Sequence, residues 1–439
     1  MRRTRTEDDR AAARARVEDD RTAYGSRAAN GRTAYGSRAA DDREAAGTRT
    51  ADDRDAAGIR TVDADVAGAI GRVLDEVLGA RLAAAAAADA LFTRDIAERV
   101  ARFTLGGGKR LRGRFVWWGL RVCGGDGEAA GAALRLAAAL ELVQTCALVH
   151  DDVMDGAELR RGRPALHAEV RGQYGHRTGA GRSARSAETF GRSAAILAGD
   201  LALAWADDTV LDTRFPDRAR SAVHALWRTM RTEMVAGQYL DLHGQVTASH
   251  SPARAVRTAR LKSARYSVER PLLLGAALAG ADDRAAGALR SAGRCAGLAF
   301  QLHDDLLGVF GDPEETGKPS GDDIREGKVT YLTAVARARA RAAGDDGALG
   351  VLDAALGDPY LSAAAVDRVR EVFESTGARA ALEDKVESLA DRSVAHLADV
   401  RTADPAALRH LRALLRATAG ARPCSPPGGP PAAARGGER

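Results

Sequence analysis

Long runs of helical pattern fill the chain between Val62 and Ala421, built from alanine, leucine and arginine with few aromatic or β-branched residues. This composition favours helix over strand throughout. Glycine or proline separates the runs, and each is long enough to span a helical bundle. The predicted runs are Val66–Arg102, Gly131–Met154, Ser193–Leu211, Arg218–Leu242, Ala253–Leu278, Gly287–Phe310 and Val329–Ala343. The pattern therefore predicts an all-α domain of roughly ten or more helices around a central cavity.

Both ends of the chain lack this pattern. Residues 1–61 contain an eleven-residue repeat, in which Asp-Asp-Arg begins at positions 8, 19, 41 and 52. The repeat holds almost no large apolar residue, and residues 422–439 are rich in proline and glycine, so we expect both segments to be disordered. The predicted organisation is a disordered segment 1–61, an all-α domain 62–421 and a disordered tail 422–439. Within the domain, Arg171–Arg192 interrupts the helical pattern and is predicted to be an exposed loop.

Charge and cysteine content narrow the classes of function. The formal net charge is +5 and the pI is near 9.2, but acids and bases are interspersed and no Lys/Arg stripe carries interleaved aromatics. A nucleic-acid partner is therefore not expected. The four cysteines share no metal-ligand or disulfide spacing, which fits a reducing compartment. With no hydrophobic signal core and no apolar stretch of about 18 residues, the sequence predicts a cytoplasmic protein without a membrane span.

Two aspartate-rich segments lie inside apolar runs, where carboxylates should be rare. The first aspartate segment is Asp151–Asp155 (Asp-Asp-Val-Met-Asp), and the second is Asp304–Gly308 (Asp-Asp-Leu-Leu-Gly). Each follows a stretch of helical pattern, so the acids are expected to project from two helices into one cavity. Residues four apart share a helix face, which places Asp151 beside Asp155. Hard oxygen ligands in this arrangement suit Mg²⁺ held jointly by carboxylates and substrate phosphates.

Basic clusters accompany these acids. One is the glycine loop Gly106–Arg112 (Gly-Gly-Gly-Lys-Arg-Leu-Arg), and the other is Arg160–Pro164, directly after the first aspartate segment. An isolated D-D-x-x-D is more often a solvated helix end than a metal site. Metal-gathering acids that alternate with phosphate-binding cations instead indicate a pocket for a diphosphate.

The ordered set of motifs resembles the trans-isoprenyl diphosphate synthases, the polyprenyl synthetase family, over about Gly68–Val400. Besides the glycine loop, the two aspartate segments and the arginine pair Arg160-Arg161, the matching positions are Gly237-Gln238 with Asp241, Lys262-Ser263, Gln301, and Gly317-Lys318 with Asp323 and Lys328. The resemblance implies an isoprenoid-synthase-like helical bundle, a homodimer, and an enzyme that condenses an allylic diphosphate with isopentenyl diphosphate.

The resemblance also assigns roles to residues. Asp151, Asp155 and Asp304 would bind the metal, about three Mg²⁺ per site, while Asp152 and Asp305 would act through bound water or by orienting cations. The residues implied in catalysis are Asp151, Asp152, Asp155, Asp304, Asp305, Lys262 and Gln301. Isopentenyl diphosphate would be held by Lys109, Arg112 and Arg161, helped by Gln144, and the allylic diphosphate by Arg160, Lys262 and Lys318. Gln238 and Gln301 would line the cavity, and the other implied substrate-binding residues are Gly108, Ser263 and Lys328.

Two positions bear on the metal and on the product. Gly308 stands where the family often has a third carboxylate, and Asp312, two turns beyond Asp304, is a candidate to compensate for it. Cys146 and Ala147, just before the first aspartate segment, are small residues where bulky ones stop chain growth in the family. The implied product is geranylgeranyl diphosphate, and a longer polyprenyl diphosphate is the alternative. A regulatory subunit without activity and a class I terpene cyclase are further alternatives.

Overall fold

The structure is a computed structural model that describes residues 57–125, 127–175, 182–247, 251–312 and 321–420. By its internal contacts the chain divides into two units, Met1–Arg54 and Asp55–Arg439, and only the second contains described residues. The predicted disorder at 1–61 and 422–439 therefore falls almost wholly outside the described part. Residues 57–64 are helical, so helical structure begins a few residues before Val62.

The described part of the chain is almost entirely helical, which confirms the predicted all-α class. The α-helices are α3 (Val66–Ala88), α4 (Ala90–Phe92), α5 (Glu98–Leu105), α6 (Leu111–Val122), α7 (Gly127–Asp155), α8 (Leu166–Gly175), α9 (Arg182–Leu211), α10 (Asp217–Thr247), α11 (Pro252–Ala259), α12 (Arg270–Ala279), α13 (Asp283–Phe310), α15 (Asp322–Arg325), α16 (Tyr331–Ala343), α17 (Asp346–Ala355), α18 (Ala363–Ser375), α19 (Ala378–His396) and α20 (Pro405–Thr418). Two π-helices, η1 (Thr93–Ala97) and η2 (Arg260–Glu269), a 3₁₀ turn η3 (Leu397–Asp399) and an antiparallel hairpin of β1 (Leu159–Arg160) and β2 (Arg163–Pro164) complete the described elements.

The loop predicted for residues 171–192 is wrong over most of its length. Helix α8 continues to Gly175, and α9 begins at Arg182. Arginine and glutamate at this position form ion pairs rather than a solvated loop: Arg171 binds both Glu158 and Glu188, and Arg192 binds Glu188 one turn away. The polar residues that suggest a loop in the sequence therefore lie on the exposed face of a helix, where they pair with one another. Residues 176–181 lie outside the described part.

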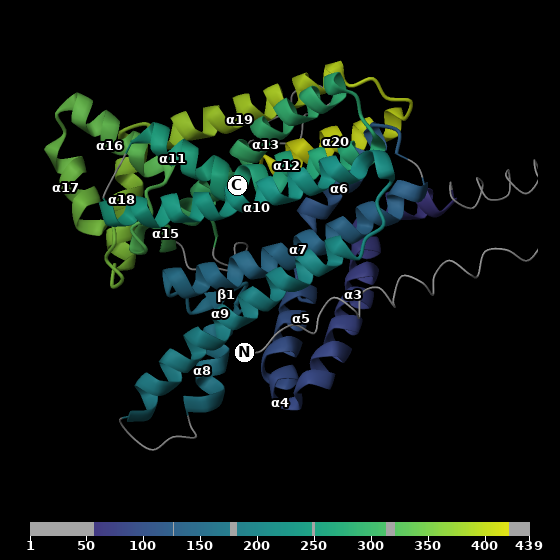
Figure 1. The fold of residues 1–439 in the computed structure, drawn as a ribbon. Coiled ribbons are helices and arrows are strands. Elements are labelled where there is room, and N and C mark those ends of the chain that lie inside the picture. Colours follow the sequence, from purple (N-terminus) through teal and green to yellow (C-terminus); the bar gives the residue numbers. More distant parts are fainter. Residues whose placement is uncertain (1–56, 126, 176–181, 248–250, 313–320, 421–439) are drawn as a thin grey trace, which may run out of the picture. The chain divides into compact units, whose positions relative to one another are not determined.

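Helix α7 is the centre of the first hydrophobic core. It packs against α9, α6 and α3, and Figure 1 shows α9 running alongside it. Leu136, Leu140 and Val143 are completely buried in this core. Among the described helices, α7 alone is long and apolar enough to cross a membrane, and most of its apolar window is buried inside the protein. It is the core helix that carries the first aspartate segment at its end.

Helix α13 carries the second aspartate segment and connects two cores. Its first half packs with α12 and η2, and its second half joins a separate hydrophobic cluster with α16, α18 and α19. Asp282 caps its N-terminus by accepting a hydrogen bond from the backbone N–H of Ala285. The helix ends at Phe310, directly after the segment that ends at Gly308.

A glycine sets the distance between α10 and η2. A Cβ at Gly237 would lie 2.0 Å from the backbone nitrogen of Lys262, so no larger residue fits at this crossing. The close approach brings Gln238 and Asp241 of α10 to the same place as Lys262. A π-helix at this point is typical of functional sites, because it shifts the direction of side chains along an otherwise regular helix.

Candidate active site

The first aspartate segment forms the last turns of α7, and cations surround it. The ammonium of Lys262 lies 3.0 Å from Oδ1 of Asp151 and 2.7 Å from Oδ2 of Asp241. Gln238 donates a hydrogen bond to the same Asp151 oxygen at 3.1 Å. Burial opposes ionisation of Asp151, but the charges of Lys262, Lys328 and Arg160 outweigh it and lower its pKa to about 2. Asp151 is therefore a carboxylate at any physiological pH.

Asp152 faces the hairpin that follows α7. Its carboxylate is 1% exposed and accepts a hydrogen bond from Nε of Arg160 at 2.7 Å. Arg160 also lies 3.7 Å from Asp151, so one guanidinium joins two acids of the segment. The next residue, Arg161, has a left-handed backbone with φ of 55°, which turns its side chain away from Arg160. The hairpin thus sends two consecutive arginines to different parts of the site.

Lys328 connects Asp155 to the region that follows the second aspartate segment. Its ammonium lies 3.1 Å from Oδ2 of Asp155 and 3.5 Å from Oδ1 of Asp323, and it also pairs with Glu326. Burial would lower the pKa of Lys328, but these three acids raise it well above its usual value. Burial raises the pKa of Asp155, against the opposing charge of Lys328. Lys328 therefore gathers acids that are far apart in the sequence.

The second aspartate segment has a different environment. Asp305 is buried, and it accepts a hydrogen bond from the neutral amide of Gln301 at 3.0 Å. Burial and then the negative charge of Asp323 raise the pKa of Asp305 to about 8. Asp304 lies on the exposed side of α13. The same acidic side chain is thus strongly ionised in one segment and held neutral near pH 7 in the other.

The space beside Gly308 is filled by Asp323. A Cβ at position 308 would lie 2.6 Å from Oδ2 of Asp323, and the carbonyl of Gly308 accepts a hydrogen bond from the N–H of Gly321 at 2.9 Å. The carboxylate that the sequence lacks at position 308 is thus matched by one from α15. The sequence predicted Asp312 for this role instead. It could not predict Asp323, because the sequence does not reveal the path of the connection that leads to α15.

The glycine loop lies against Arg161. A Cβ at Gly107 would meet Nη1 of Arg161 at 2.6 Å, so the guanidinium packs directly on the backbone of this glycine and would have to move if the residue were larger. Burial lowers the pKa of Arg161, and the positive charges of Arg110, Arg160 and Arg112 lower it further, against Glu141. Arg110 is paired with Glu141 and Arg160 with Asp152, so Arg112 and Arg161 are the two of these four arginines best placed to bind a multivalent anion.

Lys109 lies on the exposed side of this loop, beside Gly108, whose φ is 98°. Its charge helps to lower the pKa of His303, although burial is the larger cause. His303 precedes Asp304 on α13, so the loop and the second aspartate segment lie near each other. Lys109 and Asp304 therefore belong to one charged region.

Tyr266 contacts both Arg112 and Gln144, and it was not predicted as a site residue. The Tyr266 hydroxyl donates to Oε1 of Gln144 at 2.5 Å, and the Arg112 guanidinium lies 4.2 Å from the centre of the Tyr266 ring. Arg112 also donates to the Ser267 hydroxyl at 2.8 Å. Because 122 residues separate Tyr266 from Gln144, no local sequence signal could have found this contact.

The remaining predicted residues are placed as follows. Ser263 is half-buried in η2, next to Lys262. Lys318 lies outside the described residues, together with Gly317. Asp241, which was noted only as part of a motif, binds the Lys262 ammonium directly.

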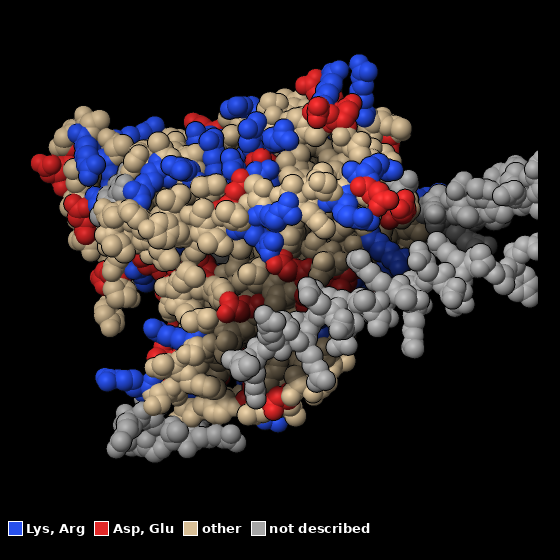
Figure 2. Space-filling view, in the orientation of Figure 1, with Lys and Arg blue, Asp and Glu red and all other residues tan. Residues whose placement is uncertain are grey.

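The carboxylates fit a divalent cation that also binds phosphate. Within the described ranges no three His, Cys, Asp or Glu side chains are close enough to hold a metal ion by themselves. Mg²⁺ is usually bound through one or two carboxylates together with substrate phosphates, and hard oxygen donors are what Asp151, Asp155 and Asp304 offer. Figure 2 shows acidic and basic side chains interspersed over one face of the molecule.

A family model described as polyprenyl synthetase matches residues 94–357, more than half of the chain and all of the site described above. The chain belongs to the polyprenyl synthetase family. It is 33% identical over 273 residues to the short chain isoprenyl diphosphate synthase of Methanothermobacter thermautotrophicus, covering 62% of this chain and 74% of that protein. It is 34% identical over 229 residues to the geranylfarnesyl diphosphate synthase of Aeropyrum pernix, covering 52% and 65%.

Solved structures agree with this assignment. The crystal structure of geranylgeranyl pyrophosphate synthase from Corynebacterium glutamicum, complexed with isoprenyl diphosphate and magnesium, matches with a TM-score of 0.74 and 37% identity. The match covers 80% of this chain and 99% of that one. The predicted family, the isoprenoid-synthase fold and the enzyme class, a trans-prenyltransferase, are thereby confirmed. Divalent metal use by this family member follows with them.

In this polyprenyl synthetase the accessible face of α7 runs below the first aspartate segment. Gln144, Ala147 and Leu148 are half-buried at helical spacing before Asp151, whereas Leu140 is completely buried. The accessible face of α7 therefore extends from Asp151 to Gln144, about two turns, and Leu140 on the next turn is closed off from solvent. Cys146 points elsewhere, because its Sγ lies 3.7 Å from Nδ1 of His150, which packs against Gly199 of α9.

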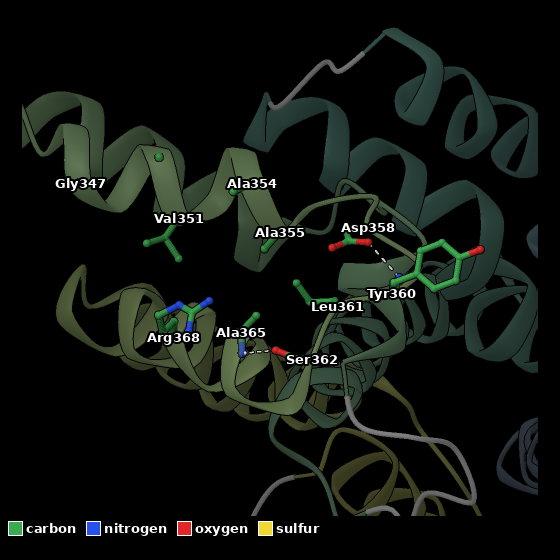
Figure 3. A pocket seen from close by; sticks show the side chains of 11 residues that line it. Gly347, Val351, Ala354, Ala355, Asp358, Tyr360, Leu361, Ser362, Ala365 and Arg368 are labelled. Atoms are coloured by element: carbon green, nitrogen blue, oxygen red, sulfur yellow. Dashed lines mark hydrogen bonds between the residues drawn. The ribbon is translucent and has the colours of Figure 1, made fainter.

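A second cavity of about 590 Å³ lies between α17 and α18, away from the aspartate segments (Figure 3). Its lining includes Val351, Ala355 and Leu361, with Asp358 and Arg368 as charged members. Asp358 accepts a hydrogen bond from the backbone N–H of Tyr360, so it serves the connection between the two helices. Among the described residues, no member of the two aspartate segments and no phosphate-binding candidate lines this cavity.

Proposed function

We propose that the protein condenses an allylic diphosphate with isopentenyl diphosphate and that its product is all-trans geranylgeranyl diphosphate. The observation that carries this proposal is the convergence of the two aspartate segments through Lys328, which contacts Asp155 of the first and Asp323 beside the second. Acids from α7, α13 and α15 thus face one region, with Lys262 and Arg160 at its edge.

In this proposal the allylic diphosphate binds between the aspartate segments, with about three Mg²⁺ bound by Asp151, Asp155 and Asp304. Mg²⁺ supplies neutralisation of the negative charge that develops on the departing diphosphate. Asp152 fixes the Arg160 guanidinium, and Asp323 takes the place of the acid missing at Gly308. Lys262, Lys318 and Lys328 are the cations for the same diphosphate, with Gln238, Ser263 and Gln301 lining the cavity.

Isopentenyl diphosphate would bind to Arg112, Arg161 and the glycine loop. Arg112, Arg161, Lys109 and Gly108 surround its diphosphate, and Gln144 reaches it from α7. Because the two diphosphates are held by separate basic groups, the isopentenyl double bond can lie next to the allylic carbon that loses its diphosphate. Holding the two in this order removes much of the entropic barrier to bond formation.

The residues present are sufficient for this reaction. Cleavage of the allylic C–O bond gives a delocalised carbocation and a diphosphate anion, and preorganised cations stabilise the charge on that anion. The isopentenyl double bond then attacks the carbocation, and a proton leaves to restore an alkene. The released diphosphate can accept this proton, so the reaction requires no histidine or cysteine base.

The open face of α7 supports geranylgeranyl diphosphate as the product. In this proposal the growing chain follows this face as a shaft, in which Ala147 leaves room one turn below Asp151 and Leu140 closes the shaft two turns further on. We expect Ala147→Phe to shorten the main product by one isoprene unit, because the ring would fill the shaft. Cys146→Phe is the control, because Cys146 faces His150 rather than the shaft. An unchanged product from Ala147→Phe would place the floor elsewhere.

Elongation assays test the whole proposal. Purified protein with Mg²⁺, farnesyl diphosphate and labelled isopentenyl diphosphate should give geranylgeranyl diphosphate, identified by chromatography of the dephosphorylated products. A longer product would assign the chain to a synthase of longer polyprenyl diphosphates. No elongation from any allylic primer would favour a regulatory subunit, and a cyclic hydrocarbon would favour a terpene cyclase.

We also propose a homodimer that works in the cytoplasm, formed through α9. Phe190, Leu197, Ala204 and Leu211 recur every seven residues on this helix, and all four are exposed. A heptad of exposed apolar side chains is typical of a helix that packs against another helix. Light scattering should give the mass of a dimer, and Leu197→Glu should give a monomer.

A further inference from the structure

Arg110, the residue of the glycine loop between Lys109 and Leu111, forms a buried ion pair with Glu141, and neither residue is among the predicted site residues. Its Nη1 lies 2.9 Å from Oε2 of Glu141 on α7, and the side chains are 9% and 7% exposed. The same nitrogen donates to the carbonyl of Thr104 at 2.9 Å, and Nη2 donates to the carbonyl of Leu105 at 3.1 Å. One guanidinium therefore joins the end of α5, the start of α6 and the middle of α7.

The backbone of Arg110 is left-handed, with φ of 48°. A non-glycine residue keeps this strained conformation only when its surroundings fix it in place, and here the three hydrogen bonds of the guanidinium do so. Gly108 is also left-handed, with φ of 98°. Lys109 thus stands between two residues of positive φ, and the direction of its side chain depends on both.

A second hydrogen bond strengthens the same contact. The Thr104 hydroxyl lies 2.8 Å from the Thr145 hydroxyl, and both residues are buried. The end of α5 is therefore tied to α7 at two neighbouring points, through Thr145 and through Glu141. The loop between α5 and α6 spans only residues 106–110, so fixing its two ends fixes its path.

A buried ion pair is a poor means of gaining stability alone. Removing two charges from water costs about as much as their attraction returns, and apolar replacements of similar volume are often as stable. Such pairs are better explained by the arrangement they enforce. Here the arrangement enforced is that of Lys109, Arg112 and Arg161, since Arg161 packs on Gly107 of the same loop.

We infer that Arg110 and Glu141 are positioning residues for the isopentenyl diphosphate subsite: the pair holds the glycine loop so that Lys109 and Arg112 meet the diphosphate of that substrate. This inference rests on the proposed function. Neither residue touches the substrate. The pair affects only the half of the site made by the loop, because the cations of the allylic subsite lie on η2, on the hairpin and after α15.

The test compares stability with binding in the same variants. In Glu141→Gln and in Arg110→Met, we expect KM for isopentenyl diphosphate to rise at least about tenfold, because a displacement of binding groups by about 1 Å has effects of this size. kcat at saturation and KM for farnesyl diphosphate should stay within about twofold. Calorimetry with isopentenyl diphosphate alone, without a primer, should show the same weakening.

The double variant Arg110→Met with Glu141→Met separates the two roles. It removes both charges, so its unfolding midpoint should return toward the wild-type value, while its affinity for isopentenyl diphosphate should stay low. If the double variant is stable and binds isopentenyl diphosphate like the wild type, the pair is a stability element only and the inference is wrong. Should the double variant not fold, Glu141→Gln decides by the same criterion, because it keeps the shape and one acceptor.

Asp63→Asn is the matched control. Asp63 pairs with Arg121 at the other end of α6, so its variant also loses an ion pair of that helix but should leave both KM values unchanged. A wild-type protein that neither binds nor elongates isopentenyl diphosphate would refute the proposed function. A normal wild type with a normal Glu141→Gln would refute this inference alone.

Discussion

Both aspartate segments begin with a pair of aspartates near the end of a helix, yet the surroundings of their acids differ. In the first, all three acids contact a cation: Asp151 contacts Lys262, Asp152 contacts Arg160 and Asp155 contacts Lys328. In the second, Asp305 has a neutral partner in Gln301 and an acidic neighbour in Asp323. The pKa of Asp151 is lowered to about 2, and that of Asp305 is raised to about 8.

The difference shows that the sequence of a motif does not by itself determine the pKa values of its acids. Lysines on η2 and after α15 contact Asp151 and Asp155 of the first segment, and they keep Asp151 ionised, so that it is ready to attract a divalent cation. In the second segment, burial and the negative charge of Asp323 oppose ionisation of Asp305, and positive charge that arrives with the ligands would offset both. We regard the first segment as the preorganised half of the site and the second as the half completed on binding.

The most severe way to break this comparison is to remove the charge at the centre of the first segment. Asp151→Asn should lower kcat/KM for elongation by about 10³-fold, because it removes a proposed metal ligand and the acid that Lys262 contacts. Asp217→Asn, at a position that is 91% exposed on α10, should have no effect. An Asp151→Asn enzyme within tenfold of the wild type would mean that the first segment is not the preorganised half.

The next largest effect should come from Lys328, which lies between the two segments. Lys328→Met leaves Asp155 and Glu326 buried without their cation, so we expect a loss of about 3–5 kcal/mol in the free energy of unfolding. Urea denaturation measures it. Adding Glu326→Gln should recover part of the loss, since one of the two unpaired charges is gone. Equal stability of Lys328→Met and the wild type would show that Lys328 does not gather these acids.

A smaller effect is expected where the second segment lacks its own acid. Gly308→Asp should lower kcat/KM about tenfold, because the new carboxylate and that of Asp323 would compete for one space. Combining it with Asp323→Ala should restore activity above that of either single variant, since the acid is then supplied from α13 instead of α15. If Gly308→Asp alone were as active as the wild type, Asp323 would not occupy that space.

Sequence pattern predicted the parts of this molecule that depend on local spacing. Helical runs such as Gly131–Met154 correspond to α7, and the run Gly287–Phe310 corresponds to α13, each with its ends a few residues off. The aspartate segments and the glycine loop were also recognisable, because their chemistry is contained in a few consecutive residues. The first part of α9, before Ser193, was wrongly predicted to be a loop, because its arginine and serine residues conceal the apolar face of the helix.

The contacts that decide electrostatics could not be predicted, because they join distant parts of the chain. Asp323 meets Gly308, Glu141 meets Arg110, and Tyr266 meets Gln144 only once the helices have packed. The opposite pKa shifts of Asp151 and Asp305 follow from such contacts and from burial. Neither quantity is encoded by spacing along one helix.

The last expected effect concerns pH, and it sharpens the comparison most directly. In the folded protein the raised pKa keeps Asp305 protonated up to about pH 8, while an unfolded aspartate ionises near 3.8. Between these values the folded state binds the extra proton, so the free energy of unfolding falls as pH rises, by on the order of 1 kcal/mol per pH unit. Asp151 has the opposite sign: its lowered pKa contributes stability above about pH 4, which is lost as pH falls toward 2.

Urea denaturation from pH 5 to pH 8, with chelator present, separates the Asp305 contribution from all others. Asp305→Asn cannot ionise, so the stability of the variant relative to the wild type should increase with pH over this range and level off above it. The stability of Asp151→Asn relative to the wild type should show no such trend, because the carboxyl group of Asp151 in the wild type is ionised in both the folded and the unfolded state throughout this range. Parallel curves for Asp305→Asn and the wild type would mean that Asp305 is ionised like Asp151, and the two halves of the site would then not differ in charge.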